Sequence, residues 1–180
     1  MAIKTKSLYK NDRRIYVFLG VMSLVVFLLS SSVMPFIAGE KAFPAGDLML
    51  CFACLVPAFV PVKSAVVFAL VLGFLSDLFL NEPQCFSPII FLVSVLLVSF
   101  FYRFFSRIGS LTMAVCALPC LAIRSIVDTF VIMASYKDSK AFDVLSAITL
   151  PSLAVNFALS IVTAFVLRKL IKKLGIFYEN

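Results

Sequence analysis

Four ionisable residues lie inside long apolar stretches of this 180-residue chain: Asp47, Asp77, Arg124 and Asp128. Charged groups in such surroundings are costly and usually carry a function. Three carboxylates could support acid–base catalysis, which needs a positioned proton donor and acceptor. Alternatively, the carboxylates and the guanidinium could bind one another and form a structural polar network. Which of these holds depends on the elements that carry the four residues.

Arg124 and Asp128 are four residues apart, so both lie on one face of a helix. One interpretation is a self-neutralised pair that lets the helix enter apolar surroundings. The order of base before acid is the less favourable one for such a pair, which leaves room for a partner on another helix. Because contact with lipid would be costly for either group, we expect both to face the interior of a helix bundle.

Asp47 and Asp77 lie near opposite ends of their stretches. Asp47 opens its stretch, where it could cap the free N–H groups of its own helix. Asp77 stands close to the C-terminal end of a helix, where the dipole disfavours a negative charge. Asp77 therefore has no evident local role, and together with Arg124 it is the strongest candidate for a defined polar contact.

Metal, cofactor and catalytic motifs are not found in the sequence. Histidine is absent, which removes the commonest metal ligand and general base. Cys51 and Cys54 lie inside an apolar stretch, as do Cys116 and Cys120, so we interpret all four as buried apolar side chains. Cys85 falls in a loop instead. No phosphate-binding loop, serine-hydrolase motif or zinc-protease motif occurs. We expect a protein that is not an enzyme and binds no cofactor or metal.

The composition indicates an integral membrane protein. Apolar residues make up 63% of the chain, against about 45–50% in soluble domains, and the mean hydropathy is +1.12. A soluble globule of this size cannot bury that much apolar surface. The net charge of +7 would suit nucleic acid, but the apolar fraction favours a lipid bilayer and no nucleic acid.

Six apolar stretches are long enough, or nearly so, to cross a bilayer as helices. They predict an all-α protein with six transmembrane helices in one bundle, between a basic N-terminal segment, 1–14, and a basic C-terminal tail, 168–180. A β-barrel would need alternating segments of about ten residues, which these stretches lack. The predicted spans within the transmembrane domain, 15–167, are 15–34, 47–60, 64–80, 89–105, 111–133 and 144–167. The second span is the shortest and contains Pro57, so we expect it to be tilted or partly unwound where other helices cover it.

Basic residues are distributed unevenly between the loops, which predicts the orientation of the chain. With the N-terminus in the cytoplasm, 12 of the 16 Lys and Arg residues lie on the inner side and 3 on the outer side, while Arg124 lies within the bilayer. Both termini are therefore expected in the cytoplasm. The same threading places Asp47, Asp77, Arg124 and Asp128 in the outer half of the bilayer or at its outer face, where they could form one network.

Two short motifs carry a resemblance to a known family. Asp47 follows a proline in the segment Phe43-Pro44-Ala45-Gly46-Asp47-Leu48, and the third span closes with Gly73-Phe74-Leu75-Ser76-Asp77-Leu78. In pattern and length, residues 40–105 resemble the rod shape-determining protein MreD, a small protein of the bacterial inner (cytoplasmic) membrane. The family usually has Pro and Asp adjacent and glycines after the second motif, and this chain departs from both patterns.

The resemblance implies a non-enzymatic, multi-pass membrane scaffold of the bacterial rod (elongation) complex, involved in cell shape and peptidoglycan synthesis. It implies binding of an MreC-like bitopic protein, and through it of a RodA-like glycosyltransferase, a class B penicillin-binding protein and MreB. The six-helix architecture also resembles the substrate-binding S-component of energy-coupling-factor vitamin transporters, which gives an alternative function. S-components typically show an Ala-x-x-x-Ala contact on the first helix, whereas the first span here contains no Ala. A third hypothesis, an intramembrane hydrolase or lipid-modifying enzyme using Asp77 and Asp128, predicts that Asn at both positions abolishes activity.

Overall fold

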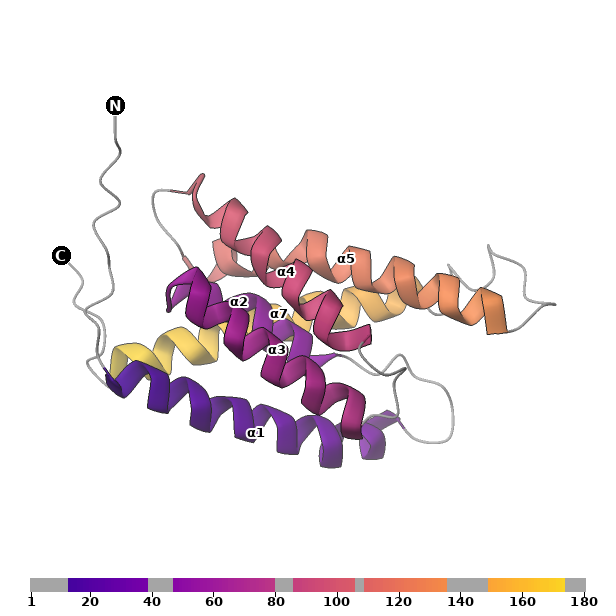
Figure 1. The fold of residues 1–180 in the computed structure, drawn as a ribbon, viewed down its shortest axis with the longest axis horizontal. Coiled ribbons are helices and arrows are strands. Elements are labelled where there is room, and N and C mark those ends of the chain that lie inside the picture. The colour runs from indigo at the N-terminus through magenta and orange to yellow at the C-terminus, as the bar shows by residue number, and fades with distance from the viewer. Residues whose placement is uncertain (1–12, 39–46, 80–85, 106–108, 136–148, 174–180) are drawn as a thin grey trace.

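The computed structural model describes residues 13–38, 47–79, 86–105, 109–135 and 149–173, and within these ranges the chain forms six α-helices and one 3₁₀ turn. The helices are α1 (Arg13–Ala38), α2 (Leu48–Leu55), α3 (Val62–Phe79), α4 (Phe86–Tyr102), α5 (Ser110–Ser135) and α7 (Leu150–Lys173), and the turn η1 (Val56–Ala58) follows α2 (Figure 1). The predicted all-α class is confirmed. Residues 144–148 of the sixth predicted span, and most of both predicted terminal segments, lie outside the described residues.

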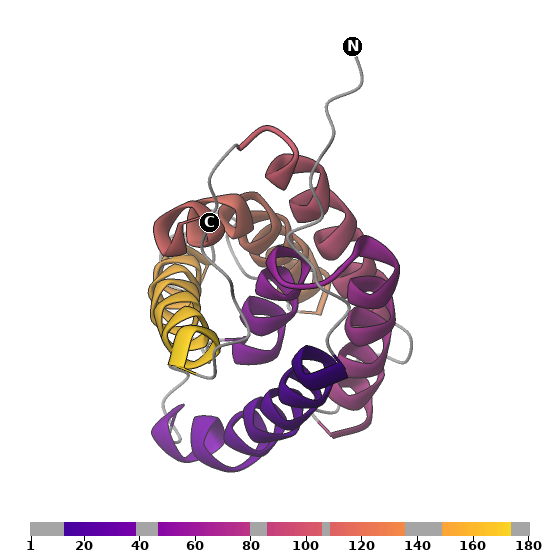
Figure 2. The same cartoon turned by 90° about the vertical axis from the view of Figure 1, so that its left-hand side faces the viewer.

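The short helix α2 occupies the centre of the bundle, surrounded by the five longer helices (Figure 2). Its residues from Met49 to Leu55 are each at most 1% exposed, and α2 contacts each of the five other helices that the structure describes. A helix that is apolar on every side is stable only when it is covered all round. The hydrophobic core of the described part of the chain is therefore built around α2.

The α2–η1 segment is too short to cross a bilayer by itself. It covers Leu48–Ala58, about 16 Å at 1.5 Å per residue, against a hydrocarbon thickness of about 30 Å. Pro57 lies at the start of η1, where its missing N–H does not interrupt an α-helix. The chain then turns at Pro61, whose carbonyl oxygen accepts the N–H groups of Ser64 and Ala65 in α3. The partial unwinding expected for the second span is present at the end that leads into α3.

The lengths and surfaces of the helices suit a membrane. Among the described residues, three helical segments are long and apolar enough to cross one: Arg13–Ser31 in α1, Ser110–Phe130 in α5, and Leu150–Lys173 in α7. Large apolar side chains also point outward from the longer helices, and these five are all more than half exposed: Leu24, Leu78, Phe100, Phe130 and Phe165. Such apolar surface on many sides is unusual for a protein in water and suits contact with lipid.

The charged residues separate between the two ends of the bundle. The start of α1 and the end of α7 lie at the same end (Figure 1), and a contact between Tyr16 and Ser64 places the start of α3 there as well. The described basic residues other than Arg124 belong to helix termini at this end: Arg13, Arg14, Lys63, Arg103, Arg168, Lys169, Lys172 and Lys173. The described carboxylates, Asp47, Asp77 and Asp128, lie toward the opposite helix termini.

Candidate functional site

Asp77 caps a helix other than its own. Its Oδ1 atom accepts a hydrogen bond of 3.0 Å from the backbone N–H of Ser87, the second residue of α4. The end of α3 is an unfavourable place for a carboxylate, but the start of α4 has free N–H groups and the positive end of a dipole. This contact supplies the role that the position of Asp77 in its own helix did not reveal.

Gly73 permits this contact because it lets the backbones of α3 and α4 approach closely. A Cβ atom on residue 73 would lie 2.5 Å from the Cα atom of Pro88 and 2.7 Å from its nitrogen, closer than non-bonded atoms tolerate. Gly73 and Asp77 are four residues apart and therefore share a face of α3. The Gly-x-x-x-Asp motif has two linked roles. Its glycine lets the first turn of α4 pack closely against α3, and its aspartate accepts a hydrogen bond from that turn.

Arg124 reaches the same helix start from α5. Its side chain is buried, and the carbon of its guanidinium lies 5.5 Å from the centre of the Phe86 ring, within the range of a cation–π contact. Phe86 directly precedes Ser87, so Arg124 and Asp77 contact adjacent residues of α4. Their contacts join α3, α4 and α5 at one point.

Arg124 also binds Asp128 one turn further along α5. The Nε atom of Arg124 donates to Oδ2 of Asp128 at 3.1 Å, so the pair within one helix that we considered from the sequence is present. The side chain of Asp128 is 43% exposed, against 8% for Arg124. The expectation that both groups face the interior therefore holds for Arg124 and only in part for Asp128, whose carboxylate lies at the edge of the bundle.

Asp47 caps the central helix and connects it to α7. Its Oδ1 atom accepts the N–H of Leu50 at 2.8 Å, which is the N-cap role considered from the sequence. The backbone N–H of Asp47 itself donates to Oδ1 of Asn156 on α7 at 2.6 Å. The Cys51 thiol lies 3.2 Å from the Asn156 carbonyl oxygen. Asn156 therefore fixes the start of α2 against the surrounding ring of helices.

These contacts bring Asp77 and Arg124 to the start of α4, with Asp128 bonded to Arg124, and place Asp47 at the start of α2. Sequence reasoning missed the partners Phe86 and Ser87 because neither is charged. The available signal was their position just after a loop, where a helix has free N–H groups. It also missed a hydrogen bond between the hydroxyl groups of Thr129 and Thr149, which joins α5 to the residue before α7.

The cysteines in the apolar helices are free, buried thiols. Cys51, Cys54, Cys116 and Cys120 are all in this state, and the Cys120 thiol lies 3.4 Å from the carbonyl oxygen of Ser94. Within the part of the chain that the structure describes, no group of three or more His, Cys, Asp or Glu residues is placed to hold a metal ion. Cys85 lies outside the described residues.

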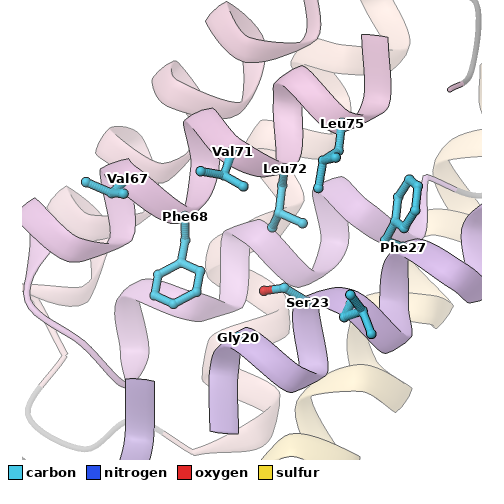
Figure 3. A pocket seen from close by; sticks show the side chains of 9 residues that line it. Gly20, Ser23, Phe27, Val67, Phe68, Val71, Leu72 and Leu75 are labelled. Carbon is cyan, nitrogen blue, oxygen red and sulfur yellow. The ribbon is translucent and has the colours of Figure 1, made fainter. Parts of the chain in front are cut away.

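A pocket of about 410 Å³ lies between α1 and α3 (Figure 3). It is lined by Gly20, Ser23, Leu24 and Phe27 of α1 and by Val67, Phe68, Val71, Leu72 and Leu75 of α3. None of the four candidate residues lines it, and no lining residue is ionisable. The polar groups at the helix starts are therefore separate from this pocket.

Comparison with known proteins identifies one family. The model of the family described as rod shape-determining protein MreD matches residues 12–174, a range that contains all the described helices and all four candidate residues. No curated protein and no solved structure matches the chain. The family match extends well beyond residues 40–105, on which the two sequence motifs rest.

Proposed function

The chain belongs to the MreD family of rod shape-determining proteins, and on this premise we propose that it is a non-enzymatic, multi-pass scaffold of the bacterial inner membrane. The resemblance drawn from the sequence motifs is thereby confirmed. In the proposed role the protein holds an MreC-like bitopic protein. Through that partner it is linked to a RodA-like glycosyltransferase, a class B penicillin-binding protein and MreB.

The main support for the scaffold proposal is that the interior polar residues bind other parts of the bundle itself. Asp47 and Asp77 accept N–H groups at helix starts, and Arg124 contacts Asp128 and Phe86. Catalysis requires a nucleophile or base within reach of a bound substrate. Here the Asp77 carboxylate joins α3 to α4, the Asp47 carboxylate caps α2, and the Asp128 carboxylate pairs with Arg124 within α5, which supports a structural role.

The transporter alternative gains no support from these contacts. A vitamin site would be expected to combine an apolar pocket with a few convergent polar groups. The described pocket between α1 and α3 has apolar walls, and its one hydroxyl, on Ser23, is bonded to the Leu19 carbonyl oxygen. We therefore propose the scaffold role alone.

We propose that the basic end of the bundle faces the cytoplasm, so that both termini lie inside. The positive-inside rule supports this orientation because the helix termini at that end carry the described basic residues other than Arg124. Asp47, Asp77 and Asp128 then lie in the outer half of the membrane. The short central helix α2 needs no lipid contact of its own, because the other helices cover its backbone and side chains.

Co-purification tests the scaffold proposal. A tagged copy of the full chain, co-expressed with the MreC-like protein of the same organism, should recover that partner after extraction in mild detergent. Arg124→Ala should recover much less partner because it removes the guanidinium that contacts Phe86 at the start of α4 and Asp128 on α5. Arg103→Ala is the matched control, since Arg103 is exposed beyond the end of α4. Failure of the folded wild-type chain to recover any partner of wall synthesis would contradict the proposal.

A further inference from the structure

The pocket between α1 and α3 is a groove lined by residues between positions 20 and 27 of α1 and between positions 67 and 75 of α3 (Figure 3). The hydroxyl of Ser64 donates to the Tyr16 oxygen at 3.4 Å, a separation of 48 residues along the chain. The lining residues Gly20 and Phe68 are also 48 residues apart in the sequence, as are Leu24 and Leu72. The groove therefore begins one turn beyond the Tyr16–Ser64 contact and continues for about two turns.

The walls of the groove suit an apolar occupant. Gly20 leaves the space open, because a Cβ atom at this position would meet nothing within 4 Å. The one polar side chain in the wall is Ser23, and its hydroxyl donates to the Leu19 carbonyl oxygen at 2.8 Å. A polar ligand would find no ionisable partner there and would lose its hydration.

Three exposed basic residues mark one end of this groove. Arg13 and Arg14 form the start of α1, and Lys63 directly precedes Ser64 on α3. The Tyr16–Ser64 contact places these starts side by side. A molecule with its apolar part in the groove would therefore hold its polar end among three positive charges. This charge complementarity selects an anionic amphiphile.

The length of the groove favours a lipid chain over a partner helix. The lining residues of α1 run from Gly20 to Phe27, about 10 Å of helix, which is less than half of a hydrocarbon core of about 30 Å. A spanning helix would need a contact stripe along most of α1, and close helix packing favours small residues. The large rings of Phe27 and Phe68 form the walls instead, and they suit a thin, flexible chain.

We propose that this groove binds one acyl chain of an anionic phospholipid of the cytoplasmic leaflet, whose headgroup lies among Arg13, Arg14 and Lys63. The inference rests on the membrane orientation proposed above. It assigns to the protein a specific lipid contact in addition to its scaffold role.

Native mass spectrometry of the full chain tests this lipid site. After purification in mild detergent, the protein is incubated with phosphatidylglycerol or with phosphatidylcholine of the same acyl chains. We expect one retained phosphatidylglycerol, bound at least about fivefold better than phosphatidylcholine, since each cation near the headgroup contributes on the order of a fivefold preference. Lys63→Gln should reduce this preference about fivefold, whereas Arg103→Gln, at the end of α4, should leave it unchanged.

A second pair of variants tests the groove itself. Gly20→Phe places a ring in the open space and should abolish lipid retention, while Val21→Phe, at an exposed position that does not line the groove, should retain it. Equal retention by the two variants, or equal binding of the two lipids by the wild type, would overturn the proposal.

Crosslinking in membranes separates a lipid from a protein occupant. A photoreactive side chain in place of Val71 should give an adduct with the mass of a phospholipid. An adduct with another protein would overturn the lipid assignment. Labelling that places the two termini on opposite sides of the membrane would refute the proposed orientation instead, so the two failures are distinguishable.

Discussion

The backbones of α3 and α4 are in contact at Gly73 and Pro88. Adding a single methyl group at position 73 therefore tests directly how closely these two helices pack. In Gly73→Ala, the new Cβ atom would lie 2.5 Å from the Pro88 Cα atom, about 1 Å inside the usual carbon–carbon contact distance. The obstructing atoms belong to backbone, so no side-chain rotation relieves the clash. Moving α4 away by about 1 Å would stretch the Asp77–Ser87 hydrogen bond from 3.0 Å to a length at which it is lost.

The expected cost combines three effects. Overpacking costs about 1–3 kcal/mol, the lost cap costs about 1 kcal/mol, and the higher helix propensity of Ala returns about 1 kcal/mol. The net destabilisation is therefore about 1–3 kcal/mol. For a chain of this size, that lowers the midpoint of thermal unfolding by roughly 2–12 °C.

Thermal unfolding in detergent measures this effect, with Gly20→Ala as the matched control. A Cβ atom at position 20 meets nothing within 4 Å, so Gly20→Ala should be as stable as the wild type or slightly more stable. Asp77→Leu should also cost less in the Gly73→Ala background than alone, because the cap is then already lost. An unfolding midpoint of Gly73→Ala equal to that of Gly20→Ala would refute the close approach of α3 and α4.

Three further predictions concern the other polar and thiol groups. Arg124→Ala should destabilise the protein more than Lys63→Ala, by about 1 kcal/mol, because it removes the contacts of a buried guanidinium with Phe86 and with the partly exposed Asp128; equal free energies of unfolding would contradict this. Asn156→Ala should cost about 1 kcal/mol through the lost contact with the Asp47 N–H, and Val155→Ala, measured beside it, should cost less. A maleimide reagent should leave Cys51, Cys54, Cys116 and Cys120 unmodified in the native protein and modify them after denaturation, as read by mass spectrometry, because all four are buried.

Much of the architecture was predictable from local sequence properties. Long apolar stretches indicate helices wherever the backbone must satisfy its own hydrogen bonds, and the spacing of Arg124 and Asp128 indicated their pairing. The position of Asp47 before an apolar run indicated its cap. Each of these features depends on residues close together in the chain.

The partner of Asp77 was not predictable in the same way. Its donor is a backbone N–H of Ser87, and every residue type except proline carries such a group. The contact also depends on Gly73, whose value is the absence of a side chain opposite Pro88. Such a fit is visible only once two helices are placed against each other.

The sequence led us to expect other helices over part of the second span, but not that α2 would lie at the centre of the described bundle. An apolar segment of about 16 Å cannot reach across the hydrocarbon core, which indicates cover by other helices more than exposure to lipid. The groove between α1 and α3 depends on the register of two helices that are far apart in the chain, which no local pattern reports.

The role of Asp77 as a hydrogen-bond acceptor is tested most directly by cell shape. The test uses a rod-shaped bacterium in which this protein replaces the bacterium's own MreD-family protein. Asp77→Asn keeps an oxygen that can accept the Ser87 N–H, while Asp77→Leu removes that oxygen at similar side-chain volume. We predict that Asp77→Asn maintains rods and that Asp77→Leu gives round cells. Round cells with a folded, membrane-inserted Asp77→Asn protein would show that the negative charge or acid function is required, and would contradict the structural role.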